Sequence, residues 1–169
     1  MGVDFTTEDL HIHSFGEGDR QALGKILSDR QVAKTYMLPD FDSKEAVDRM
    51  FARFWELSLR DDRYVAGIYQ GEELIGFVND VAVKDGCIEL GYVIAPEHWN
   101  KGYATQTLCG AVKDLFGRGY GEVLAGAFVE NPASIRVMVK SGMTKIPFEE
   151  DIDYRGMNHH CVYYSVKKI

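Results

Sequence analysis

The sequence predicts an α/β sandwich in which helices flank a mixed sheet. Helical spacing of apolar residues dominates the N-terminal part of the chain, and a meander of short apolar runs separated by glycine-containing turns follows it. Beyond residue 86 the pattern alternates between strand-like and helix-like segments. Helices, then a meander, then a β-α-β-α-β pattern indicate helices packed on a sheet that holds both parallel and antiparallel strands.

The individual elements can be assigned in chain order. Strands are expected at residues 10–15, 64–69, 74–83, 87–94, 123–129, 144–148 and 161–166. Helices are expected at 19–27, at 44–59, directly after the 99–105 segment and at 131–142. Ser43 is placed to cap the 44–59 helix, whose apolar residues form one broad face. Turns are expected at Gly71 and at residues 84–86.

Length and composition favour a single domain over residues 1–169. A chain of 169 residues that is 46% hydrophobic can bury a substantial core without disulfides. The three cysteines, Cys87, Cys109 and Cys161, lie far apart with no metal-ligand spacing, which favours reduced thiols and no bound metal. The N-terminus lacks the regions of a signal peptide and no apolar run has membrane length, so we expect a cytoplasmic protein. The net charge of −7 argues against a nucleic-acid surface and is compatible with a cationic substrate.

The most informative segment is residues 99–105, Trp-Asn-Lys-Gly-Tyr-Ala-Thr, between an apolar strand and a helix. The free amides and the positive dipole end of a helix's first turn favour an anion, and a pyrophosphate fits them well. Gly102 and Ala104 matter because a larger side chain would keep phosphate oxygens away from these amides. The alternative is ordinary helix capping, for which a glycine near a helix start is common.

A second short helix carries its own start and stop signals. Asn131 is placed as the N-cap, Pro132 as the first helical residue and Gly142 as the left-handed residue that ends the helix.

With these two segments, the chain resembles the GNAT superfamily of acyl-CoA-dependent N-acyltransferases. In particular it resembles the branch of the ribosomal-protein N-terminal acetyltransferases, the RimJ/RimL type. The resemblance covers residues 10–166, and its diagnostic pieces are the 99–105 loop and the Asn-x-x-Ser helix that starts at Asn131. It implies a largely antiparallel mixed sheet with a splayed strand pair at the acyl-CoA site. It also implies acetyl-CoA as cosubstrate, with no metal.

The resemblance also implies the cofactor-binding residues. It places the pantetheine arm against Val93 and Ile94, bonded by Asn131, and the pyrophosphate on Asn100, Lys101, Gly102, Tyr103, Ala104 and Thr105. Gly91, inside the strand that precedes the loop, suits a bulge that breaks the strand ladder; the alternative is that it only relieves a packing clash. The branch usually has Gly at position 100 and Glu at position 106, where this chain has Asn100 and Gln106. Because Asn tolerates positive φ, we expect the turn to survive.

The chemistry requires a neutral amine to attack the thioester directly, in a ternary complex, and a thiolate to leave. Many superfamily members protonate the sulfur with a Tyr at the position of Met138, which has no proton to donate. The resemblance favours Ser134, one turn earlier, as the donor instead, with helix capping as its alternative role. Two carboxylates are candidate bases: Glu89 on the splayed strand, and Asp153 in the acidic segment 149–153, which is otherwise a solvated loop.

The acceptor is expected to be a primary amine, with a protein or peptide N-terminus favoured. An α-amine is easier to deprotonate than a lysine side chain, and the RimJ/RimL-like branch acetylates protein N-termini. Relatives in that branch acetylate small amines, so a small amine or polyamine stays open. So does a non-catalytic acyl-CoA sensor. A nucleotide-binding function in another fold would leave the 131–142 helix unexplained, and the chain lacks the glycine spacings usual in nucleotide-binding loops. We expect no nucleic-acid or membrane partner, and a monomer or a homodimer.

Overall fold

The computed structural model describes residues 2–169 and contains the expected mixed sheet. Its strands are β1 (Asp4–Thr6), β2 (His11–His13), β3 (Val65–Gln70), β4 (Glu73–Lys84), β5 (Cys87–Ile94), β6 (Glu122–Phe128), β7 (Thr144–Tyr154) and β8 (Met157–Lys167). Within the described residues they form one sheet in the order β1-β2-β3-β4-β5-β6-β8-β7. Among residues 2–169 only the β5–β6 pair is parallel, so the sheet is largely antiparallel, as predicted.

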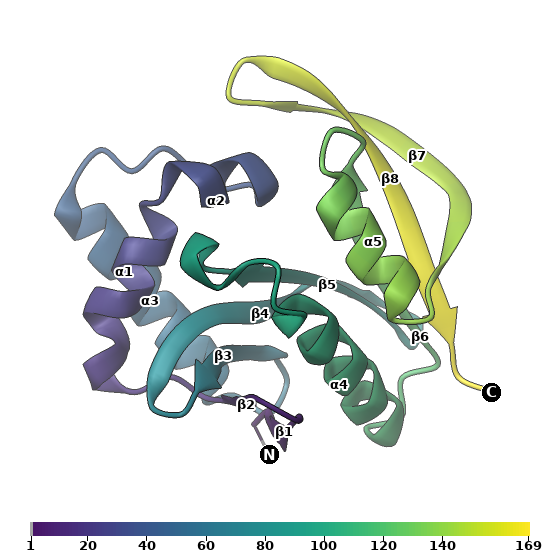
Figure 1. The fold of residues 1–169 in the computed structure, drawn as a ribbon, viewed down its shortest axis with the longest axis horizontal. Helices are drawn as coiled ribbons and strands as arrows, with labels where there is room; N and C mark the ends of the chain where they lie inside the picture. Colours follow the sequence, from purple (N-terminus) through teal and green to yellow (C-terminus); the bar gives the residue numbers. More distant parts are fainter. Residues whose placement is uncertain (1) are drawn as a thin grey trace.

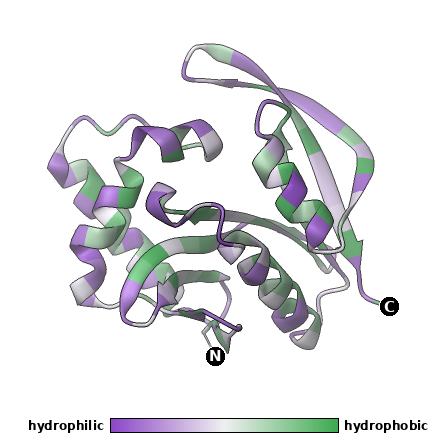
Figure 2. Ribbon diagram, viewed as in Figure 1, coloured by the Kyte–Doolittle hydropathy of each residue, from purple (hydrophilic) through white to green (hydrophobic). Residues whose placement is uncertain are grey.

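The helices cover the two faces of the sheet separately (Figure 1). They are α1 (Arg20–Leu27), α2 (Arg30–Thr35), α3 (Lys44–Ser58), α4 (Tyr103–Gly117) and α5 (Pro132–Lys140). One core cluster joins α1, α2 and α3 to the sheet, and the other joins α4 and α5 to its opposite face. Figure 2 shows hydrophobic and hydrophilic residues alternating along α1 and α3, as helices with one buried face require. No helix among residues 2–169 is long and apolar enough to cross a membrane.

Local signals account for the helix ends. The Ser43 hydroxyl accepts a 3.1 Å hydrogen bond from the Ala46 amide, which confirms the predicted cap of α3. The α2 helix was not expected from the sequence. It is only six residues long, too short for a periodic pattern, and the carboxylate of Asp29 caps it by accepting from two amides.

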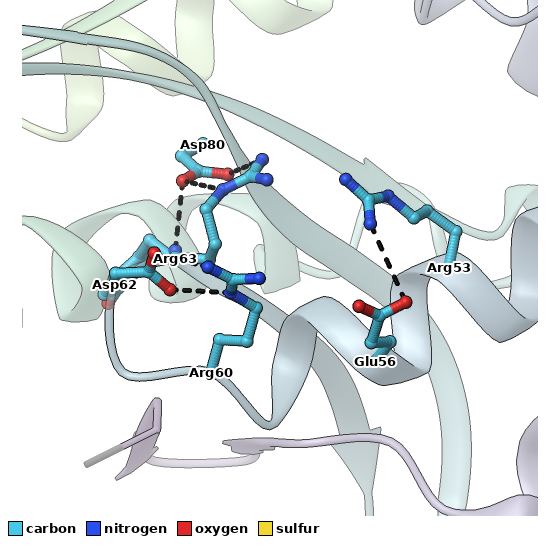
Figure 3. A network of polar contacts seen from close by, with 7 residues as sticks. Arg53, Glu56, Arg60, Asp62, Arg63 and Asp80 are labelled. Atoms are coloured by element: carbon cyan, nitrogen blue, oxygen red, sulfur yellow. Dashed lines mark hydrogen bonds and ion pairs between the residues drawn. The ribbon is translucent and has the colours of Figure 1, made fainter.

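A partly buried ion pair fixes β4 where its pairing with β5 is irregular. The register of the two strands shifts between Asp80 and Ala82. The Asp80 carboxylate, 8% exposed, accepts two 2.8 Å bonds from the Arg63 guanidinium and one from the Tyr64 amide (Figure 3). A bidentate pair of this kind holds the irregular segment in a single geometry.

The predicted splaying of β5 from β6 is present, but Gly91 does not form the bulge. The two strands pair only over Cys87–Glu89, and β5 continues without β6 as far as Ile94. Gly91 itself pairs in register with Asn79, and the irregularity lies on β4. A Cβ atom at Gly91 would lie 2.9 Å from the Tyr36 ring, so glycine is needed here for a close approach.

The last two strands are longer than predicted. Residues 149–153 belong to β7, so the expectation of a solvated acidic loop is wrong. Two left-handed residues, Arg155 and Gly156, join β7 to β8 and make a tight two-residue hairpin turn. The hairpin extends well beyond the rest of the sheet, toward the side of the molecule that carries α2 (Figure 1).

Candidate functional site

A pocket of about 510 Å³ opens beside the unpaired edge of β5. Its walls are the end of β5, the start of α4, one side of α5 along its length and the last residue of α2, Thr35. The splaying creates this space, because after Glu89 no neighbouring strand covers the β5 backbone on that side. Backbone groups of residues 90–94 that would face β6 in a continuous ladder therefore face the pocket instead.

The loop before α4 has the backbone geometry of an anion-binding turn. Asn100 has φ of 62° and Gly102 φ of 80°, so two left-handed residues precede the helix, and Asn100 does tolerate the turn as expected. Nothing lies within 4 Å of a Cβ atom built on Gly102, which leaves this side of the loop open to a ligand. The Trp99 indole donates a 2.6 Å bond to the Ile94 carbonyl and ties the loop to the end of β5.

The pocket brings together most of the predicted cofactor residues. Those that line it are Val93, Ile94, Asn100, Gly102, Tyr103, Ala104, Thr105 and Asn131. Lys101 does not line the pocket, and its side chain is exposed. Gln106 also lies outside, where its amide contacts Thr7 and Asp9, so its difference from the family's usual Glu does not alter the pocket.

The start of α5 places Ser134 in the pocket. The Asn131 side chain accepts from the Ser134 amide at 3.3 Å, Pro132 is the first helical residue, and Gly142 is left-handed after the end, all as predicted. The hydroxyl groups of Ser134 and Tyr92 lie 2.9 Å apart. Met138, on the same helix, is fully buried in the core and faces away from the pocket.

Several lining residues were not identified from the sequence. Arg136 and Lys140 on α5 bring two cations to the pocket, and neither makes an ion pair with another described residue. His98, assigned to loop packing from the sequence, also lines it, with 11% of its side chain exposed and a buried Nδ1 that has no hydrogen-bond partner. The spacing of Arg136 and Lys140 from Asn131 on one helix was the signal that could have revealed the two cations.

Glu89 lies on the opposite face of the sheet from Ser134. Burial, and then the charge of Glu150, raise the pKa of the Glu89 carboxyl. Glu150 accepts a 3.1 Å bond from the Tyr163 hydroxyl, and the Tyr163 ring crosses β6 over Gly126. Glu89 is also the last residue of β5 that pairs with β6, so it stands at the fork where the two strands separate.

Asp153, the other candidate base, is not beside Glu89. Its neighbours Ile152 and Tyr154 pack with Phe128, so the side chain between them points to the opposite face of the hairpin. There it is exposed and accepts a 3.0 Å bond from the Asn158 amide. Among residues 2–169 no three His, Cys, Asp or Glu side chains are grouped as metal ligands would be.

The chain thus combines a splayed parallel strand pair with a loop at one end of the gap that has the backbone geometry of an anion-binding turn. Residues 9–144 match the family model described as an acetyltransferase (GNAT) domain, so the chain is a member of the GNAT acetyltransferase family. The match covers both the loop and α5, and it ends at the first residue of β7.

Individual relatives agree with this assignment. The chain is 28% identical to the uncharacterized N-acetyltransferase YoaA of Bacillus subtilis, over 96% of this chain and 95% of that protein. The structure of the ribosomal L7/L12 alpha-N-protein acetyltransferase RimL in complex with coenzyme A superposes with a TM-score of 0.84, at 18% identity over 95% of both chains. Spermidine N-acetyltransferase from Vibrio cholerae, in complex with CoA and spermine, gives 0.80 at 17% identity, over 94% of this chain and 95% of that one. At these identities the two structures show a shared fold.

Proposed function

We propose that this protein is an acetyl-CoA-dependent N-acetyltransferase, a single domain of the RimJ/RimL-like branch that acts in the cytoplasm. Acetyl passes from acetyl-CoA to a primary amine by direct attack within a ternary complex. The observation that carries the proposal is the pocket itself, where a left-handed loop opens a helix at one end of an uncovered strand edge.

The chemistry of the lining fits each part of coenzyme A. The backbone amides of the first turn of α4, which follows Asn100 and Gly102 in the chain, suit the pyrophosphate. Arg136 and Lys140, which have no carboxylate partner among the described residues, suit phosphate charge. The uncovered backbone of residues 90–94 can pair with the amide groups of the pantetheine arm, as a strand would. The unpartnered Nδ1 of His98 offers a further hydrogen-bonding atom.

The reaction then needs a base for the amine and a donor for the sulfur. The nitrogen lone pair attacks the carbonyl carbon, a proton leaves the nitrogen, and the carbon–sulfur bond breaks with its electrons on sulfur. Glu89, at the fork of the two strands, is our candidate base, because its raised pKa makes the carboxylate a better proton acceptor. Ser134 is our candidate hydrogen-bond donor to the departing thiolate. Asp153, exposed and on the other side of the hairpin, is the weaker candidate for the base.

We favour a protein or peptide N-terminus as the acceptor, with a small amine or polyamine as the alternative. An α-ammonium, with a pKa of about 8, loses its proton at neutral pH for roughly 1 kcal/mol, whereas a lysine side chain requires about 4 to 5 kcal/mol. The carboxylates of Glu89 and Glu150, on the face of the sheet opposite Ser134, can attract either cation. The two structural relatives act on a ribosomal protein's α-amine and on spermidine, respectively, so both classes belong in the test.

Calorimetry with acetyl-CoA, CoA and ATP, paired with a thiol-release assay, tests the proposal. We expect binding of the two CoA compounds, no binding of ATP, and thiol release that depends on an added amine. Mass spectrometry of a peptide library then identifies the acetylated nitrogen. Binding without turnover across peptides, lysine derivatives and polyamines would identify an acyl-CoA sensor. Label confined to polyamines or to lysine side chains would overturn the preferred acceptor.

A further inference from the structure

Tyr92 lies in the pocket with its hydroxyl against that of Ser134. It belongs to the part of β5 that has no β6 partner, and it reaches α5 across 42 residues of sequence. The Tyr92 Oη–Ser134 Oγ distance is 2.9 Å, within the usual range for two hydroxyl groups. The other contact of Oη, to the Ser134 carbonyl oxygen, is 3.4 Å long and outside that range. The close interaction is therefore between the two side chains.

Either hydroxyl could donate across this distance, but the two groups differ in acidity. Burial raises the pKa of the Tyr92 phenol to about 12, so it keeps its proton throughout the neutral range. Because a phenol is still more acidic than an aliphatic alcohol, Tyr92 is the better donor and Ser134 the better acceptor. Once Oη donates to the serine oxygen, the single hydrogen of Ser134 has no acceptor among the described residues. That hydrogen is left to point into the pocket that both residues line.

A serine on its own is a poor donor to a departing thiolate, because its hydroxyl rotates freely and is only weakly acidic. The buried Met138 has no hydrogen to contribute. A hydroxyl that accepts one hydrogen bond becomes a stronger donor of the next, since the bonds in a chain polarise one another. A fixed acceptor bond also removes rotational freedom that the serine would otherwise lose in the transition state.

We propose that Tyr92 is a positioning residue that donates to Ser134 Oγ and thereby directs the Ser134 hydrogen to the thioester sulfur. The inference rests on the proposed function, in which Ser134 is the donor. As the carbon–sulfur bond breaks, its electron pair moves to sulfur and is stabilised by the Ser134 O–H bond. Tyr92 keeps its own proton throughout. The amine's proton is taken by the candidate base Glu89, which passes it to the solvent, and the proton that completes the CoA thiol comes from the solvent.

Tyr92→Phe removes the hydroxyl and keeps the ring. We expect kcat to fall about tenfold, with the KM for acetyl-CoA and the calorimetric Kd of CoA within about twofold of the parent values. Ser134→Ala should lower kcat at least as much, and the double variant should be no slower than Ser134→Ala alone, because Tyr92 acts through the serine. Tyr64→Phe is the matched control: its buried hydroxyl donates to Asp114 at 2.9 Å, away from the pocket. It should leave kcat unchanged.

The outcomes separate the two proposals. An unchanged kcat in Tyr92→Phe, or losses that multiply in the double variant, would overturn the role of Tyr92 while leaving Ser134 as donor. Full activity of Ser134→Ala would instead show that Ser134 is not the donor on which the inference rests.

A second variant applies where Tyr92→Phe weakens CoA binding. Tyr92 is then replaced by a polyfluorinated tyrosine, whose phenol is far more acidic. We then expect kcat to fall as pH rises through the pKa of that phenol, and an unaltered pH profile would contradict the proposal.

Discussion

The hydroxyl of Tyr154 donates a 2.7 Å hydrogen bond to the carbonyl oxygen of Ala33. The Tyr154 hydroxyl oxygen in turn accepts a 3.1 Å bond from the Leu38 amide, so one side chain at the end of β7 holds both the end of α2 and the loop after it. Arg155, in the hairpin turn, adds an ion pair with Asp40. These contacts fasten the β7–β8 hairpin to the segment that ends beside Thr35 in the pocket wall.

Tyr36, in the segment that Tyr154 holds, packs against Gly91 on the face of β5 that also carries the candidate base Glu89. Tyr154→Phe should therefore affect the acceptor more than the cofactor. It removes the acceptor of one bond and the donor of another, and leaves the Ala33 carbonyl and the Leu38 amide without this partner. We expect the KM for the amine to rise about fivefold to tenfold, which corresponds to roughly 1 to 1.4 kcal/mol. The Kd of CoA should stay within about twofold. Steady-state kinetics and calorimetry measure the two quantities, with Tyr64→Phe as the control. A change in CoA affinity alone would show that the hairpin supports the cofactor instead.

Gly102 is the position at which the loop is most sensitive to substitution. At φ of 80° a branched residue is strained, and its side chain would occupy the space that a phosphate needs. We expect Gly102→Val to lower CoA affinity at least tenfold, about 1.4 kcal/mol, with an unchanged circular dichroism spectrum.

Gly102→Asn separates strain from obstruction, because Asn tolerates the left-handed region. It should unfold at nearly the parent temperature and still bind CoA poorly. An unchanged CoA affinity in both variants would show that the loop is not the pyrophosphate site.

Elements with local signals could be predicted from the sequence. The α5 helix is an example, because a cap at Asn131, a proline at its first position and a left-handed Gly142 each act within a few residues. Residues 30–35 form a helix too short to show a period, and its only signal is the cap at Asp29. The turn at Arg155-Gly156 was missed because acidic residues of β7 interrupt the apolar alternation on which strand prediction depends.

The candidate site divides in the same way. The loop around Gly102 and the start of α5 are continuous segments, and both could be predicted as parts of the cofactor site from the sequence. The contact of Tyr92 with Ser134, and the charge repulsion between Glu89 and Glu150, involve residues from separate elements. Such contacts depend on strand order and on which face a side chain occupies. A single sequence does not contain that information when the strands are only half buried.

Arg136 and Lys140 should contribute to CoA affinity through phosphate charge. Both line the pocket and neither has a carboxylate partner among the described residues, so a phosphate gains their attraction without breaking an ion pair. We expect the double change to Ala to weaken CoA binding about tenfold, and to flatten the dependence of Kd on salt concentration. Lys113→Ala, on the exposed face of α4, is the control. A parent-like Kd and salt dependence in the double variant would exclude both side chains from the phosphate site.

The raised pKa of Glu89 predicts opposite effects of one side chain on activity and on stability. With Glu89 as the base, kcat/KM should decrease at pH values below the pKa of Glu89, which gives the pH profile an acidic limb. Glu150→Gln should move this limb to lower pH, because it removes a like charge near Glu89. Glu89→Gln should lower kcat about a hundredfold.

The same pKa shift affects stability. Because the pKa of Glu89 in the folded protein lies above its unfolded value, the folded protein binds more protons than the unfolded chain at pH values between these two pKa values. The free energy of unfolding therefore decreases as pH rises through that range. Glu89→Gln should therefore unfold at a higher temperature than the parent at pH 8, and at nearly the same temperature at pH 4. Thermal unfolding across this pH range measures the stability difference, with the exposed Glu45→Gln as the control variant. An acidic limb of the kcat/KM profile that does not move in Glu150→Gln would exclude Glu89 as the base.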